Sequence, residues 1–277
     1  MSDARYAVFG NPVAHSQSPF IHRRFALQLD ESISYQRQEV ALGEFAAAAR
    51  DFFAGGGGGL NVTVPFKRDA AVFADELSER AERADAVNTL VLRGEKVVGD
   101  NTDGVGLLTD LQQNLRWSLA GKKVLLLGAG GAARGVLSPL LAAAPASLCL
   151  ANRTEARALT LASAFATEAE TNSCQLMALP CSAVPSGFDL VVNATSASLS
   201  GELPAVNAAA VDGAYCYDMM YAATATPFLR WAAKSGARQL ADGLGMLVEQ
   251  AAESFFLWRG RRPETTEVIA ALRRAII

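Results

Sequence analysis

Four short polar segments in the first 104 residues of this 277-residue chain carry side chains that could bind and reduce a small molecule. Lys67 closes the segment Leu60–Lys67, and Asp103 lies within Asn101–Gly104. Lys67 comes just past an expected strand end, where open α/β sheets bind ligands. Taken alone, Lys67 is equally consistent with an exposed lysine, and Asp103 with a helix cap. Together the four segments offer ammonium, carboxylate, amide and hydroxyl groups, which suit a ligand with several hydroxyls and one carboxylate.

The segment His15–Pro19 supplies two of the hydroxyls. In an extended backbone Ser16 and Ser18 project to the same side. Ser18 before Pro19 is also typical of a helix N-cap, which taken alone is the better interpretation. Two hydroxyls beside a helix N-terminus are nevertheless well suited to bind a carboxylate.

The strand expected at Leu60–Val64 carries polar residues on one face. By alternation Asn61 and Thr63 face opposite to Val62 and Val64. A parallel strand buried on both faces should be apolar throughout, so the polar face predicts a polar cavity. Asn88, followed by Thr89, forms another polar corner at the end of an expected element.

The strongest local signal is the segment Lys122–Gly135, where a short apolar strand runs into glycines and then into a helix. Gly128 permits a tight turn, Gly130 lets backbone N–H groups approach a pyrophosphate, and Ala133 allows close packing of the helix on the strand. The helix N-terminus offers unpaired N–H groups to the anion. This arrangement predicts a dinucleotide-binding unit rather than a plain glycine turn.

The end of the next strand indicates which dinucleotide is bound. NAD sites place Asp or Glu there, but here Ser147–Ala151 is followed by Asn152, Arg153 and Thr154, with Arg157 one turn further. Guanidinium groups suit a 2′-phosphate through charge-assisted bonds. The alternative is that both arginines are solvated and Thr154 caps a helix, which is compatible with binding. The cofactor predicted is NADP.

Strands and helices alternate along the chain, which predicts an α/β protein with mostly parallel sheets. The glycine run Gly55–Gly59 is interpreted as a helix end followed by a loop. Helical stretches over Arg68–Arg83 precede a hairpin of Thr89–Arg93 and Lys96–Gly99. In the first part the expected strands are Tyr6–Phe9, Ile33–Val40 and Leu60–Val64. The expected helices between them are Pro19–Leu29 and Leu42–Ala54. In the rest of the chain the expected strands are Lys122–Leu127, Ser147–Ala151, Asp189–Ala194 and Tyr215–Met219. The expected helices there are Asp103–Leu115, Thr154–Ala166, Leu244–Trp258 and Glu264–Ile277.

Composition excludes several classes of protein. Hydrophobic residues make up 51% and charged residues 19%, which allows a substantial core. The net charge of −3 and pI near 5.5 argue against nucleic acid as a partner. No apolar run is long enough to span a membrane, and no signal-peptide core is evident. Four scattered cysteines and two histidines argue against a metal site and favour a reducing cytoplasm.

An ordered set of motifs resembles the shikimate dehydrogenase family. They are HSQSP, NVTVPFK, AVNT, NTDG, GAGGAAR, ANRT, NATS, YDMMY with TPFL, and DGLGMLVEQAA. The resemblance covers essentially the whole chain. It implies reversible reduction of 3-dehydroshikimate to shikimate with NADPH in aromatic amino-acid biosynthesis.

The resemblance also assigns roles by position. It implies that Lys67 and Asp103 form the catalytic pair and that Ser16 and Ser18 hold the substrate carboxylate. The rest of the substrate site would comprise Asn61, Thr63, Asn88, Asp103, Tyr221 and Gln250. The cofactor site would comprise Glu79, Gly128, Ala129, Gly130, Gly131, Ala132, Asn152, Arg153, Thr154, Arg157, Met219 and Gly243.

The resemblance further implies two domains, in a fold whose C-terminal helices return to the first. Residues 1–107 and 243–277 would form the α/β substrate domain, and residues 108–242 the Rossmann-type NADP domain. Periodicity alone leaves open whether the final helices cap the second domain or return to the first. The expected assembly is a monomer or a homodimer with small-molecule ligands.

Two positions depart from the family pattern. Arg23 follows His22 where the family usually has Asn, and Ala222-Ala223 stand where a Gly soon follows the tyrosine. Two alternatives stay open: a quinate/shikimate dehydrogenase that uses NAD, and a non-catalytic NADP sensor. A sensor would not need both Lys67 and Asp103.

Overall fold

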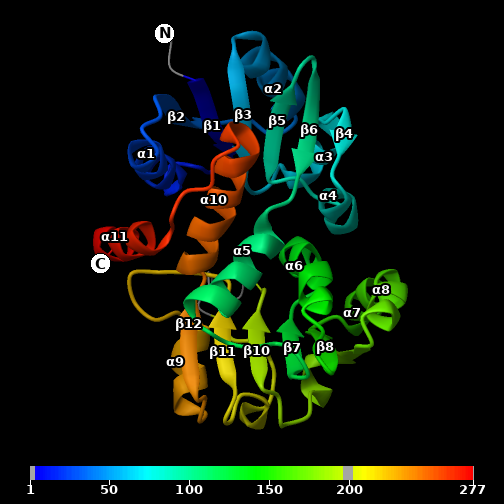
Figure 1. Cartoon of the computed structure of the whole chain (residues 1–277). Coiled ribbons are helices and arrows are strands. Elements are labelled where there is room, and N and C mark those ends of the chain that lie inside the picture. Colours follow the sequence, from blue (N-terminus) through cyan, green and yellow to red (C-terminus); the bar gives the residue numbers. More distant parts are fainter. Residues whose placement is uncertain (1–3, 196–201, 277) are drawn as a thin grey trace. The chain divides into compact units, whose positions relative to one another are not determined.

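The computed structural model describes residues 4–195 and 202–276 (Figure 1). The chain divides into two compact units. The first comprises Met1–Gly106 and Val248–Arg274, and the second is made mainly of Leu107–Leu247. Each unit contains a six-stranded sheet of its own. The α/β class and the two-domain architecture predicted from the sequence are confirmed.

The sheet of the first unit has the strand order β2-β1-β3-β5-β6-β4. Parallel pairing joins β1 to β2 and β3, and β4 to β6, whereas β5 runs antiparallel to β3 and β6. The predicted hairpin is confirmed as β5 and β6, and its strand β5 is the antiparallel member of an otherwise parallel sheet. The strands are β1 (Ala4–Gly10), β2 (Ile33–Glu39), β3 (Gly57–Val62), β4 (Glu76–Leu77), β5 (Thr89–Arg93) and β6 (Lys96–Asp100).

The helical stretch predicted over Arg68–Arg83 is interrupted. Ala74 is extended, and the Asp75 N–H donates to the carbonyl of Val97, so a short strand pairs with β6 between two helices. Pairing with a distant strand therefore overrides the local helical preference. The helices of the first unit are α1 (Ser18–Gln28), α2 (Phe45–Ala54), α3 (Lys67–Phe73) and α4 (Glu79–Ala84), and α11 (Thr266–Ile276) belongs to it as far as Arg274. Ile277, the last residue of the predicted terminal helix, lies outside the described residues.

Two further helices each include residues of both units: α5 (Asp103–Thr109), which continues as a π-helical turn over Asp110–Asn114, and α10 (Leu244–Arg259). The later part of α10 packs on the first unit, where Trp258 Nε1 donates to the carbonyl of Leu90 at 3.0 Å. Figure 1 shows α10 in front of β3 and β5. The return of the C-terminal helices to the first unit is thus confirmed.

The glycine run is not a loop, contrary to the prediction. Gly55 and Gly56 end α2, but Gly57, Gly58 and Gly59 form the first half of β3. A Cβ on Gly57 would lie 2.1 Å from the Phe52 ring, and one on Gly59 would lie 2.2 Å from Trp258 Nε1. These glycines let aromatic rings lie directly on the strand.

The second unit has the strand order β12-β11-β10-β7-β8-β9, with every neighbouring pair parallel. Counted from β7, this order is that of a Rossmann dinucleotide-binding sheet. The strands are β7 (Lys123–Leu127), β8 (Ser147–Asn152), β9 (Gln175–Pro180), β10 (Leu190–Asn193), β11 (Tyr215–Asp218) and β12 (Gln239–Asp242). The helices are α6 (Gly131–Ala142), α7 (Glu155–Ala164), α8 (Ala166–Thr171) and α9 (Pro227–Lys234).

Burial explains which strands the sequence reveals. Val124 to Leu127 in β7 are fully buried and alternate between two apolar clusters, one on each face of the sheet. By contrast β9 and β12 are the edge strands and are only partly buried, so their apolar pattern is weak and the sequence did not predict them. In the described ranges, no helix is both long enough and apolar enough to span a membrane.

Gly59→Ala should lower the free energy of unfolding by about 1–3 kcal/mol, because its methyl group would push the Trp258 ring out of place. The matched control is Gly58→Ala, whose Cβ would lie 3.3 Å from Tyr6 and needs only a small adjustment. Urea unfolding of both variants compares them. Equal stability of the two would show that contact with Trp258 does not explain the glycine.

Candidate active site

The topology of the first sheet gathers the predicted polar residues at one edge. Because β1, β3 and β6 run in one direction and β5 runs in the other, three strand ends and one strand start share that edge. Lys67 follows β3 as the first residue of α3, Asn88 precedes β5, and Asp103 follows β6 as the first residue of α5. Residues 36 positions apart are thereby brought into contact.

Lys67 and Asp103 form an ion pair, with Nζ 2.5 Å from Oδ2. The other carboxylate oxygen of Asp103 accepts a hydrogen bond from Asn88 Nδ2 at 2.8 Å. The Asp103 side chain is 13% exposed and that of Lys67 31% exposed, so the ammonium group remains accessible to a ligand. Asn101 Oδ1 accepts from the Asp103 backbone N–H at 3.1 Å, which leaves the Asp103 carboxylate to orient Lys67.

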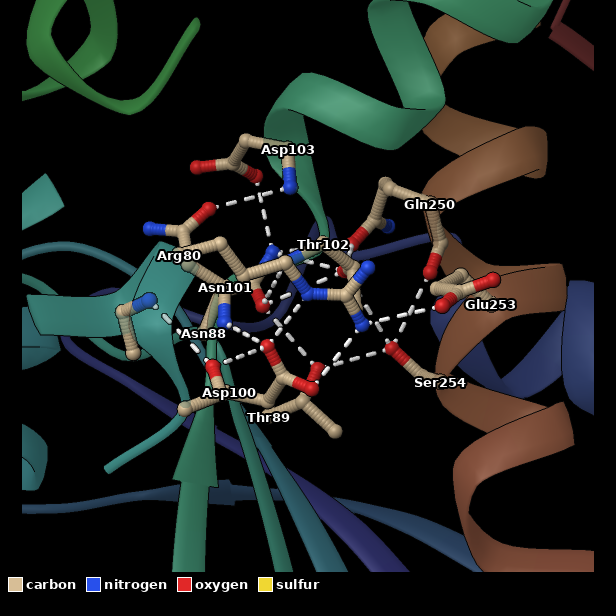
Figure 2. A network of polar contacts seen from close by, with 12 residues as sticks. Arg80, Asn88, Thr89, Asp100, Asn101, Thr102, Asp103, Gln250, Glu253 and Ser254 are labelled. Carbon is tan, nitrogen blue, oxygen red and sulfur yellow. Dashed lines mark hydrogen bonds and ion pairs between the residues drawn. The ribbon is translucent and has the colours of Figure 1, made fainter. Parts of the chain in front are cut away.

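Asn88 is the centre of a buried polar network (Figure 2). Its Oδ1 accepts from the Thr102 backbone N–H at 2.9 Å, and its Nδ2 donates to Thr102 Oγ1 at 3.0 Å and to Gln250 Oε1 at 3.3 Å. Thr102 Oγ1 also donates to Gln250 Oε1, at 3.2 Å. The predicted residues Asn88, Asp103 and Gln250 are therefore joined, although they come from separate parts of the chain.

An ion cluster adjoins this network (Figure 2). Arg80 binds both oxygens of Asp100, at 2.5 and 2.9 Å, and its Nη2 also donates to Glu253 Oε1 at 2.9 Å. Burial would lower the pKa of Arg80, but the hydrogen bonds and charges of the two carboxylates outweigh it and raise that pKa. The guanidinium thus stays charged.

Ser16 and Ser18 also lie together. Ser16 Oγ donates to Ser18 Oγ at 3.2 Å, and Arg37 Nε donates to the carbonyl of Ser16 at 2.8 Å. Ser18 is the first residue of α1 and Gln17 occupies the N-cap position without a side-chain bond. The interpretation of Ser18 as an N-cap is therefore wrong, and Ser18 is placed in the first turn of the helix instead.

Asn61 lies in the interior rather than on the wall of an open polar cavity, contrary to the prediction. It is 6% exposed, and its Oδ1 accepts from Tyr35 Oη at 2.7 Å. Its Nδ2 donates to Ser254 Oγ at 3.0 Å and to Thr89 Oγ1 at 3.3 Å. Strand β3 ends at Val62, so Thr63, which is partly exposed, does not share a strand face with Asn61.

His22 completes this interior network. Its ring stacks on Tyr35 with centroids 4.4 Å apart, and its Nε2 lies 3.1 Å from Asn61 Oδ1. Because the amide oxygen only accepts, Nε2 is the protonated nitrogen of a neutral ring. Burial lowers the pKa of His22 to about 3, although the Asn61 hydrogen bond opposes the shift. His22 is therefore a core residue and not a proton carrier.

The glycine loop of the second unit suits a bound pyrophosphate. Gly128 has φ +111°, a conformation that side chains rarely adopt, and its N–H donates to the carbonyl of Ala151. A Cβ on Gly130 or Gly131 would meet no atom within 4 Å, so open space borders the N-terminus of α6. Ala133 is fully buried, as close helix packing requires. These residues fit a dinucleotide.

The residues expected at the adenosine end follow β8. Asn152 ends the strand, and its Nδ2 donates to the carbonyl of Thr154 at 2.9 Å. Thr154 occupies the N-cap position of α7 but makes no side-chain cap bond, so capping does not explain its hydroxyl. Arg153 and Arg157 are both exposed. This strand end therefore presents two guanidinium groups and no acidic residue at position 152.

The structure places the other predicted cofactor and substrate residues as follows. Met219 and Gly243 lie together, since a Cβ on Gly243 would be 2.1 Å from the Met219 carbonyl oxygen. Tyr221 belongs to the same unit; burial, together with the charge of Asp242, raises the pKa of Tyr221. Glu79 belongs to the first unit, where it is exposed and pairs with Arg83.

Sequence reasoning missed Arg80, Asp100, Glu253 and Ser254. Two signals could have found some of them. Asp100 immediately precedes the NTDG motif, and Glu253 and Ser254 follow Gln250 by three and four residues, which places them on the same helix face. No local signal points to Arg80, which lies 173 positions from Glu253.

Three family models match the chain. The shikimate dehydrogenase substrate binding domain matches residues 8–90, shikimate/quinate 5-dehydrogenase matches 110–212, and the shikimate 5′-dehydrogenase C-terminal domain matches 243–273. A curated shikimate dehydrogenase (NADP(+)) of Dechloromonas aromatica (strain RCB) is 54% identical over 278 residues, covering 100% of both chains.

Solved structures agree with this comparison. An Ael1 enzyme from Pseudomonas putida is 46% identical with a TM-score of 0.92, covering 98% of each chain. Shikimate 5-dehydrogenase from Thermus thermophilus, in complex with NADP(H) and shikimate, is 33% identical with a TM-score of 0.86. The alignment covers 98% of this chain and 99% of that one.

The fold and the site define a two-domain, dinucleotide-dependent oxidoreductase, in which a Rossmann unit accompanies an α/β unit that carries a lysine–aspartate pair. More specifically, the chain belongs to the shikimate dehydrogenase family.

The depressed pKa of His22 makes stability depend on pH. In the unfolded chain His22 protonates near pH 6.5, whereas in the folded chain it stays neutral to about pH 3. The unfolded state therefore gains protons first, so the free energy of unfolding falls as pH drops below 6.5, by about 2 kcal/mol at pH 5. Above pH 7 this contribution is constant.

His22→Gln should remove that component, which is seen by comparing urea unfolding at pH 7.5 and pH 5. The matched control is His15→Gln, at the other histidine of the chain, which is exposed. If His22→Gln retains the full parental loss of stability between the two pH values, His22 is not the buried neutral group described.

Proposed function

We propose that this protein catalyses the reversible NADP-dependent reduction of 3-dehydroshikimate to shikimate. The single observation that carries the proposal is the contact between Lys67 and Asp103 at the polar edge of the first sheet. Its support comes from the motif order, the Rossmann strand order and the relatives named above. The non-catalytic sensor has no use for a lysine–aspartate pair beside a cluster of substrate-type polar groups.

The substrate would be held by groups of matching chemistry. Ser18, in the first turn of α1, and Ser16, two residues before it, would hold the carboxylate with their hydroxyls. Asn88 and Gln250 would bind ring hydroxyls with their amides, from positions already linked by a hydrogen bond. We assign Thr63 and Tyr221 to the same substrate. Asn61 would act indirectly, because its amide bonds protein groups in the interior.

Lys67 would carry the chemistry of the ketone. When bound, NADPH supplies hydride to the carbonyl carbon. Negative charge then develops on the carbonyl oxygen, where the Lys67 ammonium would stabilise it and donate a proton. Asp103 would hold Lys67 in place and accept a hydrogen bond from a neighbouring substrate hydroxyl. In the reverse direction Lys67 would remove the hydroxyl proton of shikimate.

NADP would lie on the second unit. The backbone from Gly128 to Ala132 would hold the pyrophosphate at the N-terminus of α6. Arg153 and Arg157 would bind the 2′-phosphate, with Asn152 and Thr154 beside the adenosine. Met219 and Gly243 would border the cofactor, and Glu79 of the first unit would do so as well. We propose residues 1–107 with 243–277 as the substrate domain and residues 108–242 as the NADP domain.

We further propose a cytoplasmic location and a monomer or homodimer as the assembly. The four cysteines are free and buried, which supports a reducing compartment.

Lys67→Ala should lower kcat by about 10²- to 10⁴-fold with little change in KM, because it removes a contact made in the transition state. Shikimate oxidation with NADP, followed by the absorbance of the reduced nicotinamide, measures this. The matched control is Lys96→Ala, which breaks an exposed ion pair with Glu76 elsewhere on the same unit. A Lys67→Ala variant with near-normal kcat would refute the assignment.

Replacing Arg153 and Arg157 with alanine should raise KM for NADPH by about tenfold or more, since charge-assisted bonds are lost, and leave KM for NADH unchanged. Lys122→Ala, at the opposite end of β7 from the glycine loop, is the control. A parental enzyme that prefers NADH, or quinate over shikimate, would instead support the quinate/shikimate alternative.

A further inference from the structure

The guanidinium of Arg80 joins two carboxylates that belong to separate elements of the first unit. Asp100 ends β6, and Glu253 lies on α10. The side chains of Asp100 and Glu253 are only 9% and 8% exposed, and that of Arg80 is 29% exposed. None of these three residues has a role in the reaction proposed above. Glu253 also pairs with Arg262, so the cluster contains two positive and two negative groups.

One arm of this cluster leads to Asp103 (Figure 2). Asp100 Oδ1 accepts from the Asn101 backbone N–H at 2.7 Å and from Ser78 Oγ at 2.6 Å. Asn101 Oδ1 in turn accepts from the Asp103 backbone N–H. The Asp100 carboxylate therefore sets the path of the backbone between β6 and α5, from which the Asp103 side chain reaches Lys67.

The other arm leads to Gln250. Glu253 lies three residues after Gln250 on α10, so both side chains lie on one face of the helix. Gln250 Oε1 accepts from Asn88 and Thr102 on that face. Ser254, one residue beyond Glu253, is within 2.8 Å of Thr89 Oγ1. The ion pair between Arg80 and Glu253 thus holds the turn of α10 that carries Gln250 against the same sheet edge.

We propose that Arg80 is a positioning residue, which clamps the Asp103 backbone and the Gln250 helix at the separation that one substrate molecule requires. This inference rests on the proposed function. Arginine suits the role because its planar fork can bind one carboxylate with two nitrogens and still reach a second. Without Arg80, Asp100 and Glu253 would be two buried carboxylates facing each other, and their repulsion would drive the two arms apart.

The two arms should affect different kinetic parameters. Asp100→Asn keeps the size of the side chain but weakens the Asp103 arm, so kcat for shikimate should fall by about tenfold to a hundredfold, with KM changed by less than about threefold. Glu253→Gln weakens the Gln250 arm, so KM should rise by about tenfold with kcat changed by less than about threefold. Calorimetry of shikimate binding without cofactor should show the same loss of affinity for Glu253→Gln.

Arg80→Lys tests the clamp without removing its charge. Because an ammonium group cannot bind both carboxylates with a fork, this variant should lower kcat and raise KM together. The matched control is Arg259→Met on the same helix as Glu253, since the ion pair of Arg259 with Glu31 has nearly the same exposure, 31% and 13%. It should change Tm but neither kinetic parameter.

The outcomes separate the clamp from the proposed function. Parental protein that fails to oxidise shikimate contradicts the function itself. If Asp100→Asn, Glu253→Gln and Arg80→Lys lower Tm as Arg259→Met does but keep the parental kcat and KM, the clamp is contradicted. The clamp is also contradicted if Asp100→Asn and Glu253→Gln change the same kinetic parameter. Crystal structures of Asp100→Asn and Glu253→Gln give a readout independent of activity: Asp103 alone should shift in the first and Gln250 alone in the second. Parental positions in both would overturn the proposal.

Discussion

The architecture of the site depends on one constraint, the need to satisfy every polar atom of the buried Asn88 amide. The side chain is 3% exposed, so an unpaired donor or acceptor there would cost about 1–3 kcal/mol. Its partners Thr102, Asp103 and Gln250 come from the segment between β6 and α5, the start of α5 and the middle of α10. Satisfying one amide therefore brings three elements to one point, and Lys67 meets Asp103 there.

The polar side chains in the interior next to Asn88 differ in charge according to how deeply they are buried. The neutral hydroxyl of Ser254 and the uncharged ring of His22 lie on residues that are 0% exposed, whereas Asp100 and Glu253 are each 6% exposed. Charged groups lie where partners of opposite sign can reach them, as Arg80 reaches Asp100 and Glu253. This order follows from desolvation, which a neutral hydrogen-bonded group tolerates more easily than an ion. The ammonium group of Lys67 lies at the accessible end of this series.

Local patterns predicted much of this molecule, and their failures have a common cause. The predictions were correct for the hairpin, for the apolar strand before Gly128 and for the helix after it. In these elements burial of one or both faces imposes a short period on the apolar residues of the sequence. The glycine run was misread as a loop, because the reason for Gly57 and Gly59 lies in rings contributed by α2 and α10. Asn61 was misread for the same reason, since Tyr35, Thr89 and Ser254 enclose it from elsewhere in the chain.

The class of fold, the glycine loop, the absence of an acidic residue directly after β8 and the polar groups of the candidate active site could all be predicted from the amino-acid sequence alone. Each of these depends on residue types at short spacing. The antiparallel pairing of β5 with β3 and the link from Arg80 to both Asp100 and Glu253 became evident only from the folded chain. Those facts depend on which distant elements pack together, and packing energy is shared among many contacts that no local pattern records.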